Sequence, residues 1–313
     1  MKRLGVLVFA FWVGAAVAQP AVTIDLRGCE RPYACPKPHG IAVSDQGLCN
    51  VTLIGLDAVV TAEHCLTKLG LDFDRSCEGK VRFYFPTYEN GGTLKIREVT
   101  CKQVRSKSRL EVDPESGDYA VITVSGTFPE AIWVEKSAIR DGEPLRLRKY
   151  TFAKDAPPGT VAATYHEESC EAVVGSYLGP DSSTGTEPTV YVAGCGAVAG
   201  NSGAAFVDAQ GQFRAVLDGG AFFPQLPQAK LELAKSLELD AATPVDLWFI
   251  RANPAVCMTY FFGSSPLDAR CLKSLKERRD AGVNLFSGRI QDQIKSGVAR
   301  PKLDRYLRVL SRP

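Results

Sequence analysis

Residues 49–65 read CNVTLIGLDAVVTAEHC, and this stretch indicates the fold class more directly than any other. Two apolar runs, Val51–Ile54 and Ala58–Thr61, lie on either side of the turn sequence Gly55-Leu56-Asp57. Apolar runs separated by a short turn of this composition are typical of a β-hairpin. The sequence therefore predicts two antiparallel strands, with His64 three residues after the end of the second one.

Short segments of the same character occur along most of the chain. Val81, Phe83 and Phe85 alternate with Arg82 and Tyr84, and this period of two is typical of a half-buried strand. Further β-type segments are Leu94–Ile96, Tyr119–Val124, Thr160–Tyr165, Glu171–Tyr177, Thr189–Val192, Ala205–Val207 and Phe213–Leu217. Many short strands between Gly- and Pro-rich turns favour an all-β sandwich or barrel.

The chain has 313 residues, which is enough for two domains with a sizeable core. A Pro- and Gly-rich break at residues 155–159 places the boundary between two β domains near residue 150. We predict five segments: a signal peptide (1–18), an N-terminal lead-in (19–40), a first β-barrel (41–150), a second β-barrel (151–260) and a helical, basic C-terminal extension (261–313). From Arg270 onward the extension has 12 Lys or Arg and 4 Asp or Glu. This pattern favours a solvated amphipathic helix over a tail that binds membranes or polyanions.

The N-terminus has the features of an export signal. Met1-Lys2-Arg3 is positively charged, Leu4–Val13 is almost wholly apolar, and Ala16-Val17-Ala18 fits a small-residue cleavage site. The apolar run is too short to span a bilayer, and no later stretch is long and apolar enough to do so. We therefore predict a secreted or periplasmic protein without a membrane span.

The ten cysteines agree with an oxidising compartment, because their even number allows five disulfide bonds. No Cys-x-x-Cys occurs and only three histidines are present, which argues against a zinc cluster or a thioredoxin-like site. We predict neither a metal nor another cofactor. The formal net charge of +2 gives no reason to expect a nucleic-acid partner, and nothing in the sequence indicates an oligomeric state.

A glycine-rich turn, Gly200-Asn201-Ser202-Gly203, lies between two apolar segments and contains one hydroxyl group. A serine hydroxyl is a weak nucleophile at neutral pH, so chemistry here requires a base within hydrogen-bond reach. The flanking glycines allow the backbone to turn tightly and to direct its N–H groups at a bound group. Such a sequence is more often only a turn, so the hypothesis depends on a histidine and a carboxylate elsewhere.

His64 is the best candidate for the base among the three histidines, because it ends an apolar strand and precedes Cys65, which is able to pin the turn covalently. Asp118 is the candidate carboxylate, because it opens an apolar strand. A histidine at a strand end and an aspartate in a turn are each more often structural than catalytic. His64 and Asp118 support a catalytic hypothesis only because both occur in the same chain as the turn that contains Ser202.

Together these segments resemble the chymotrypsin-like (trypsin-like) serine proteases. Residues 49–65 resemble the histidine motif, in which a cysteine sixteen residues upstream pairs with the cysteine after the histidine, and this implies a disulfide bond between Cys49 and Cys65. Residues 117–122 resemble the aspartate motif of that family. Residues 200–203 resemble the nucleophile motif, in the Gly-Asn-Ser-Gly form of a bacterial-type secreted member. The order His, Asp, Ser along the chain matches as well.

The resemblance covers roughly residues 40–260 and implies two six-stranded antiparallel β-barrels packed face to face, with the active site in the cleft between them. It implies that His64 takes the proton from Ser202 as the serine attacks an acyl carbonyl, and later gives it to the leaving amine. Asp118 would hold the imidazole in the right tautomer. Backbone N–H groups of Gly200 and Ser202 would form the oxyanion hole.

The nucleophile loop departs from the family pattern at several positions. Asn201 stands where digestive members have an aspartate that pairs with a new N-terminus after cleavage, so we expect an active loop that forms without this zymogen switch. The position six residues before the serine, where cleavage after Lys or Arg requires an acid, is Gly196. Cys195 lies seven residues before the serine rather than four, and Cys170 is a candidate partner for it.

Residues 215–220 resemble the strand that lines the specificity pocket of the family and pairs with the substrate backbone. Asp218 stands where a serine usually supports the catalytic aspartate, and it either attracts basic substrate groups or turns elsewhere. We predict Gly196, Asp218, Gly219 and Gly220 as the substrate-binding residues.

The sequence and this resemblance predict a secreted serine endopeptidase that hydrolyses peptide bonds through an acyl-enzyme, with a protein or peptide as substrate. Two alternatives stay open: a catalytically inactive protease homologue that acts as a binding protein, and an esterase on the same scaffold. The complete His/Asp/Ser set argues against the first alternative. An α/β-hydrolase is disfavoured, because that fold requires a histidine after the serine and none follows Ser202.

Overall fold

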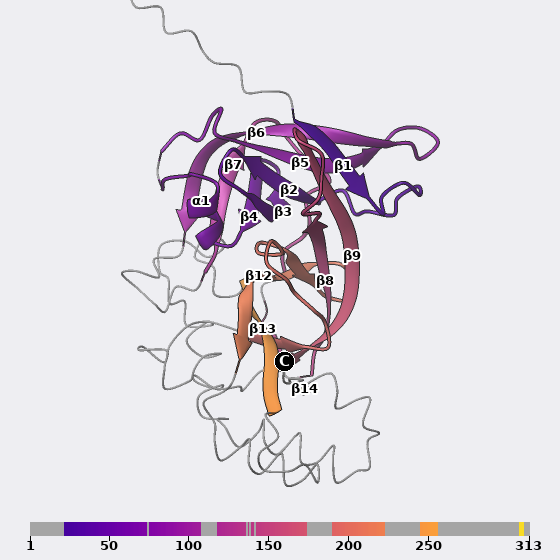
Figure 1. The fold of residues 1–313 in the computed structure, drawn as a ribbon, viewed down its shortest axis with the longest axis vertical. Coiled ribbons are helices and arrows are strands. Elements are labelled where there is room, and N and C mark those ends of the chain that lie inside the picture. Colours follow the sequence, from indigo (N-terminus) through magenta and orange to yellow (C-terminus); the bar gives the residue numbers. More distant parts are fainter. Residues whose placement is uncertain are drawn as a thin grey trace, which may run out of the picture.

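The computed structural model describes residues 22–73, 75–107, 118–135, 137, 139–140, 142–173, 190–222, 245–255 and 307–309. Within these residues the chain forms fourteen β-strands and one short helix, and the strands build two sheets (Figure 1). The structure therefore belongs to the all-β class that the sequence predicts.

The first sheet is a closed barrel of six antiparallel strands. In barrel order they are β2 (His39–Ser44), β3 (Leu48–Gly55), β4 (Ala58–Thr61), β7 (Ala120–Val124), β6 (Leu94–Lys107) and β5 (Val81–Tyr88). The predicted hairpin is confirmed, because β3 and β4 pair antiparallel on either side of residues 55–57. The alternation predicted for β5 is also confirmed, since Val81, Phe83 and Phe85 are buried in the barrel core. The strand is not half-buried, however, because Tyr84 is buried in a separate cluster with Ile41.

The second sheet contains six strands that follow one another in a ring. They are β8 (Pro144–Phe152), β9 (Thr160–Val173), β10 (Val190–Ala193), β13 (Val245–Pro254), β12 (Phe213–Phe222) and β11 (Ala205–Val207), and β11 pairs back to β8. β9 is a long, curved strand beside β8 (Figure 1). With the first barrel, this ring gives the chymotrypsin-like double-barrel architecture that the resemblance implies.

Two strands lie outside this ring. β1 (Thr23–Arg27) pairs in parallel with β9, so the N-terminal lead-in is attached to the second barrel. Leu26 of β1 is buried in one apolar cluster with Ile41 of β2 and Tyr150 of β8, so the lead-in also contacts both barrels. β14 (Leu307–Val309) pairs antiparallel with β13.

An apolar cluster shared by the two barrels holds them together. Val60 of β4 and Tyr119, which precedes β7, contribute from the first barrel. Ala205, Phe213 and Val216 contribute from β11 and β12 of the second barrel, and all five side chains are buried. The candidate site residues lie on the segments that adjoin this cluster, so its packing controls their relative position.

The eight described cysteines all form disulfide bonds, in the pairs Cys29–Cys35, Cys49–Cys65, Cys77–Cys101 and Cys170–Cys195. Cys257 and Cys271 lie outside the described residues, as does the predicted signal peptide. Of the predicted helical extension, only Leu307–Val309 is described, and these residues form the strand β14. Among the described residues, no helix has the length and apolar character needed to cross a membrane.

Candidate active site

His64 and Asp118 lie together because their strands are paired. His64 begins α1 (His64–Lys68), three residues after Thr61 of β4, and Asp118 lies two residues before Ala120, which pairs with Thr61. The Nδ1 atom of His64 lies 2.6 Å from Oδ2 of Asp118, and the backbone N–H of His64 donates to Oδ1 at 3.0 Å. A carboxylate bonded to Nδ1 favours the tautomer with the proton on Nδ1, which leaves Nε2 available as a base.

The two side chains differ in their access to solvent. The His64 side chain is 34% exposed, whereas that of Asp118 is 12% exposed. Part of the imidazole is therefore open to a reactant, while its carboxylate partner is largely screened from water. The disulfide between Cys49 of β3 and Cys65 of α1 ties the first turn of the helix to the barrel.

Ser202 lies in the turn before β11, and this turn contacts the first barrel directly. The Ser202 carbonyl accepts a hydrogen bond from the N–H of Asn50 in β3, at 2.9 Å. Gly203 has a φ of +84°, and a Cβ atom there would lie 2.0 Å from the Asn50 carbonyl oxygen and 2.3 Å from Oγ1 of Thr61. Only glycine permits this approach. The serine turn thus packs against the strand that leads to His64.

The Ser202 side chain is partly exposed. None of the hydrogen bonds among the described residues joins its hydroxyl to the His64 imidazole. In enzymes without bound substrate, catalytic hydrogen bonds are often long and tighten only when the substrate arrives. Proton transfer between these two groups would require that tightening.

The backbone N–H groups of the serine turn divide into two sets. Those of Asn201, Gly203 and Ala204 each donate to a carbonyl within the second barrel. In the part of the chain that the structure describes, the N–H groups of Gly200 and Ser202 have no such acceptor. They are therefore available to a bound group, as the donors of an oxyanion hole must be.

The residue before the serine, Asn201, is buried and fully engaged. Its Oδ1 atom accepts the N–H of Val198 at 2.8 Å, and its Nδ2 atom donates to the Tyr150 carbonyl at 2.9 Å and to Oγ1 of Thr151 at 3.2 Å. The uncharged amide therefore attaches the loop to β8 through its N–H donor and braces the loop internally through its oxygen acceptor, a combination that a carboxylate does not offer.

Asn50 is a structural residue of the site that the sequence reasoning missed. Its Nδ2 atom donates to the carbonyls of Gly200 at 2.9 Å and Tyr150 at 3.0 Å, and its Oδ1 atom accepts the Tyr150 N–H at 2.6 Å. The side chain is buried and joins β3 to both β8 and the serine loop. The available signal was a polar residue at the start of the apolar run that follows Cys49.

The predicted substrate-binding residues lie on two segments. Gly196 is exposed, in the loop between β10 and Ser202. Asp218 is buried at an irregularity of the β12–β13 pairing, and Gly219 and Gly220 pair with β13 just beyond it. Bulges of this kind redirect a side chain and are frequent beside active sites. Within the described ranges, no group of three or more His, Cys, Asp or Glu residues is arranged to hold a metal ion.

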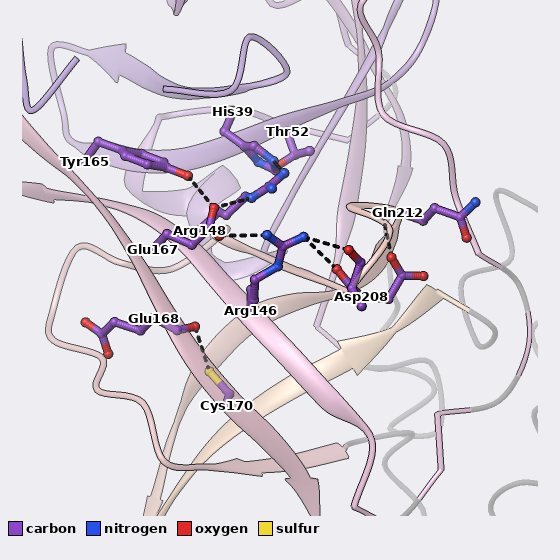
Figure 2. Close-up of polar contacts among 11 residues, drawn as sticks. His39, Thr52, Arg146, Arg148, Tyr165, Glu167, Glu168, Cys170, Asp208 and Gln212 are labelled. Atoms are coloured by element: carbon purple, nitrogen blue, oxygen red, sulfur yellow. Dashed lines mark hydrogen bonds and ion pairs between the residues drawn. The ribbon is translucent and has the colours of Figure 1, made fainter. Parts of the chain in front are cut away.

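A second polar network lies on the face of β8 and β9 that meets β2 (Figure 2). Arg146 and Arg148 contact the two oxygens of Glu167 at 3.0 and 2.8 Å, and Nη1 of Arg148 lies 3.4 Å from Nε2 of the buried His39. The Nδ1 atom of His39 is 3.1 Å from Oγ1 of Thr52. Burial, followed by the charge of Arg148, holds the pKa of His39 well below its usual value. Burial raises the pKa of Glu167, but Arg148 and Arg146 lower it by more, so the net shift is downward.

No family model and no curated protein matches this chain. Solved structures that resemble it include the scabies mite inactivated protease paralogue S-D1, with 14% identity over 58% of this chain and 80% of that one, and a TM-score of 0.44. A Glu endopeptidase in complex with MPD has 16% identity over 59% and 80%, with a TM-score of 0.43. The Rv3671c protease in its inactive form has 16% identity over 74% and 91%, with a TM-score of 0.44.

Proposed function

We propose that this chain is a secreted serine endopeptidase in which Ser202 is the nucleophile, His64 the base and Asp118 the group that orients the base. The observation that carries the proposal is the pair of hydrogen bonds by which Asp118 holds both Nδ1 and the backbone N–H of His64. A second support is that the N–H groups of Gly200 and Ser202 donate to no acceptor among the described residues, whereas those of Asn201, Gly203 and Ala204 do.

In the proposed reaction, Oγ of Ser202 attacks the carbonyl carbon of a peptide bond and its proton passes to Nε2 of His64. The N–H groups of Gly200 and Ser202 bind the oxygen that becomes negative, and one such donor is worth roughly 3–4 kcal/mol in serine proteases. His64 then protonates the leaving amine, and an acyl-enzyme remains on Ser202. Water, deprotonated by His64, hydrolyses this ester, and Asp118 stabilises the imidazolium throughout.

We also propose that the loop is competent without cleavage of the chain. Asn201 carries no charge with which to bind a new N-terminus, and its side chain is already bonded to residues of the second barrel. The test compares the protein that begins at Gln19 with the same protein cut near Gly40. Equal activity supports the proposal, whereas activity that appears only after cutting would overturn it.

For the substrate, we propose that Gly196, Asp218, Gly219 and Gly220 line the specificity pocket. The buried carboxylate of Asp218 beside two small residues favours peptides with a basic group near the scissile bond. Mapping of the cleavage sites in a peptide library by mass spectrometry tests this proposal. Cleavage sites without any enrichment of Lys or Arg would contradict it.

The central experiment is labelling of the purified protein with a fluorophosphonate probe, alongside Ser202→Ala and a control, Ser125→Ala, in which another serine is removed. Labelling of the wild type and the control, but not of Ser202→Ala, supports the proposal. Absence of labelling in the wild type, or equal labelling of all three, would refute it. Labelled protein that hydrolyses nitrophenyl esters but no peptide would instead indicate an esterase.

A further inference from the structure

Two charged side chains, Lys149 of β8 and Glu168 of β9, form hydrogen bonds to the loop that precedes Ser202. The Gly196 N–H donates to Oε2 of Glu168 at 2.7 Å, and the ammonium group of Lys149 donates to the Gly196 carbonyl. The same ammonium lies 2.7 Å from Oε1 of Glu168. Both backbone groups of one loop residue are therefore bonded to a single ion pair.

The burial of Lys149 argues for a specific role of this ion pair. The Lys149 side chain is only 7% exposed and that of Glu168 is 37% exposed. An ammonium group is costly to bury unless it is paired and hydrogen-bonded, and here Glu168 and the Gly196 carbonyl meet that requirement together. Burial raises the pKa of Glu168, but the Gly196 N–H and Lys149 lower it by more, so the carboxylate stays ionised near neutral pH.

The loop has two other attachments to the same strands. The Cys170–Cys195 disulfide joins β9 to the residue before Gly196. At the other end, Asn201 is bonded to Tyr150 of β8. Gly200 lies between these attachments and Ser202 directly follows the second one, so the position of Gly196 limits where their N–H groups point.

From this geometry we infer that Lys149 and Glu168 are positioning residues for the proposed oxyanion hole. Their ion pair holds Gly196 from both sides and thereby keeps the N–H groups of Gly200 and Ser202 aligned. This inference rests on the proposed function, since alignment matters only if Ser202 reacts.

The neighbouring pair, Arg148 and Glu167, provides a matched control. Each of these two residues lies one position away from Lys149 or Glu168 on the same strand. Because successive side chains of a strand point to opposite faces, Arg148 and Glu167 face His39 rather than the serine loop. Figure 2 shows the Glu167 carboxylate directed at Arg148, while the Glu168 carboxylate points away from this network. Glu168→Gln and Glu167→Gln are thus the same substitution at adjacent positions with different contacts.

The experiment measures the second-order rate constant of fluorophosphonate labelling for the wild type, Lys149→Met, Glu168→Gln, the double variant and Glu167→Gln. All are assayed well below their Tm. The negative phosphonyl oxygen forms in the oxyanion hole, and removal of one donor there costs about 10²–10³-fold in rate. We expect the labelling rate constant of Lys149→Met and of Glu168→Gln each to fall at least about tenfold, because an N–H group that moves out of alignment forms a weaker hydrogen bond to that oxygen. Glu167→Gln should change the rate by less than about threefold.

Hydrogen exchange provides a readout that does not depend on activity. Amides of residues 194–202 should exchange faster in Glu168→Gln and Lys149→Met, and at the wild-type rate in Glu167→Gln. The double variant should react no more slowly than the slower single variant, because the two side chains act as one unit.

The outcomes separate this inference from the proposed function. Wild-type protein that does not label refutes the proposed function and the inference together. Labelled wild type with an unchanged rate in Glu168→Gln, or with an equal loss in Glu167→Gln, overturns the inference alone. If Glu168→Gln does not fold, Lys149→Met still tests the inference, because it removes the ammonium group of the same ion pair.

Discussion

Asp118 reaches His64 with both of its carboxylate oxygens, since Oδ2 lies 2.6 Å from Nδ1 and Oδ1 accepts the backbone N–H at 3.0 Å. The first contact orients the ring, and the second ties that orientation to the start of α1. Because the same side chain makes both contacts, the ring and its backbone cannot shift independently. The pair also joins the end of β4 to the start of β7, so barrel closure and imidazole orientation depend on each other.

Asp118→Asn should abolish most of the activity while leaving the fold intact. The amide can still accept the His64 N–H, but an amide N–H facing Nδ1 favours the wrong tautomer. In serine proteases this change lowers kcat roughly 10⁴-fold, and a similar loss in fluorophosphonate labelling is expected here. Asp57→Asn, in an exposed turn of the same barrel, is the control and should label at the wild-type rate. Normal labelling of Asp118→Asn would remove Asp118 from the mechanism.

Gly203→Ala should destabilise the protein strongly, because the new Cβ would lie 2.0 Å from the Asn50 carbonyl oxygen. We expect a loss of about 2–5 kcal/mol in the free energy of unfolding, from the strained backbone and the overpacked contact. Gly79→Ala is a matched control, since its φ of +73° is similar but no atom lies within 4 Å of the site of a Cβ. The control should lose only about 1–2 kcal/mol. Urea denaturation measures both values, and equal losses would show that the close approach is unimportant.

Asn201→Asp should destabilise the protein in a pH-dependent way. The new carboxylate would lack the N–H donor that Asn201 directs at the Tyr150 carbonyl and at Thr151. A loss of about 1–3 kcal/mol is expected, because Oγ1 of Thr151 loses this donor, the Tyr150 carbonyl keeps only the Asn50 amide, and the new carboxylate oxygen would face both acceptors. Protonation would restore a donor, so burial should raise the pKa of the new group and the deficit should be smaller at about pH 5 than at about pH 8. A deficit independent of pH would contradict this explanation.

His39 should make the folded state less stable as the pH falls. Burial and the neighbouring Arg148 lower its pKa well below the unfolded value of 6.5, so its contribution is complete above about pH 6.5 and declines as the pH falls toward the folded pKa. The slope is at most about 1.4 kcal/mol per pH unit. His39→Gln should flatten the dependence of unfolding free energy on pH between about 5 and 6.5.

Two observations separate the effect of His39 from that of other groups. Glu167 and Glu168 also have lowered pKa values, but their stabilising effect is complete above the usual glutamate pKa of 4.5 and is lost only at more acidic pH. His166→Gln, at an exposed position, is the control and should retain the wild-type slope. If His39→Gln kept that slope as well, protonation of His39 would not be the cause.

Much of the double barrel could be predicted from local patterns. The hairpin of β3 and β4 and the alternation in β5 follow from apolar periodicity and turn residues, which act over a few positions. The proximity of His64 and Asp118 was expected only through the resemblance, because local pattern does not specify which strands pair. In the structure, the pairing of Thr61 with Ala120 brings these two residues together.

By itself, the sequence determined the all-β class, the hairpin that leads to His64 and the glycine turn that carries Ser202. The tertiary structure alone decided what supports that turn. Asn50, Lys149 and Glu168 all bond to residues 196–202, yet they lie between 28 and about 150 positions away along the chain. The physical reason is that a polar side chain gains a buried partner only when distant strands pack together, and no local periodicity records that partner.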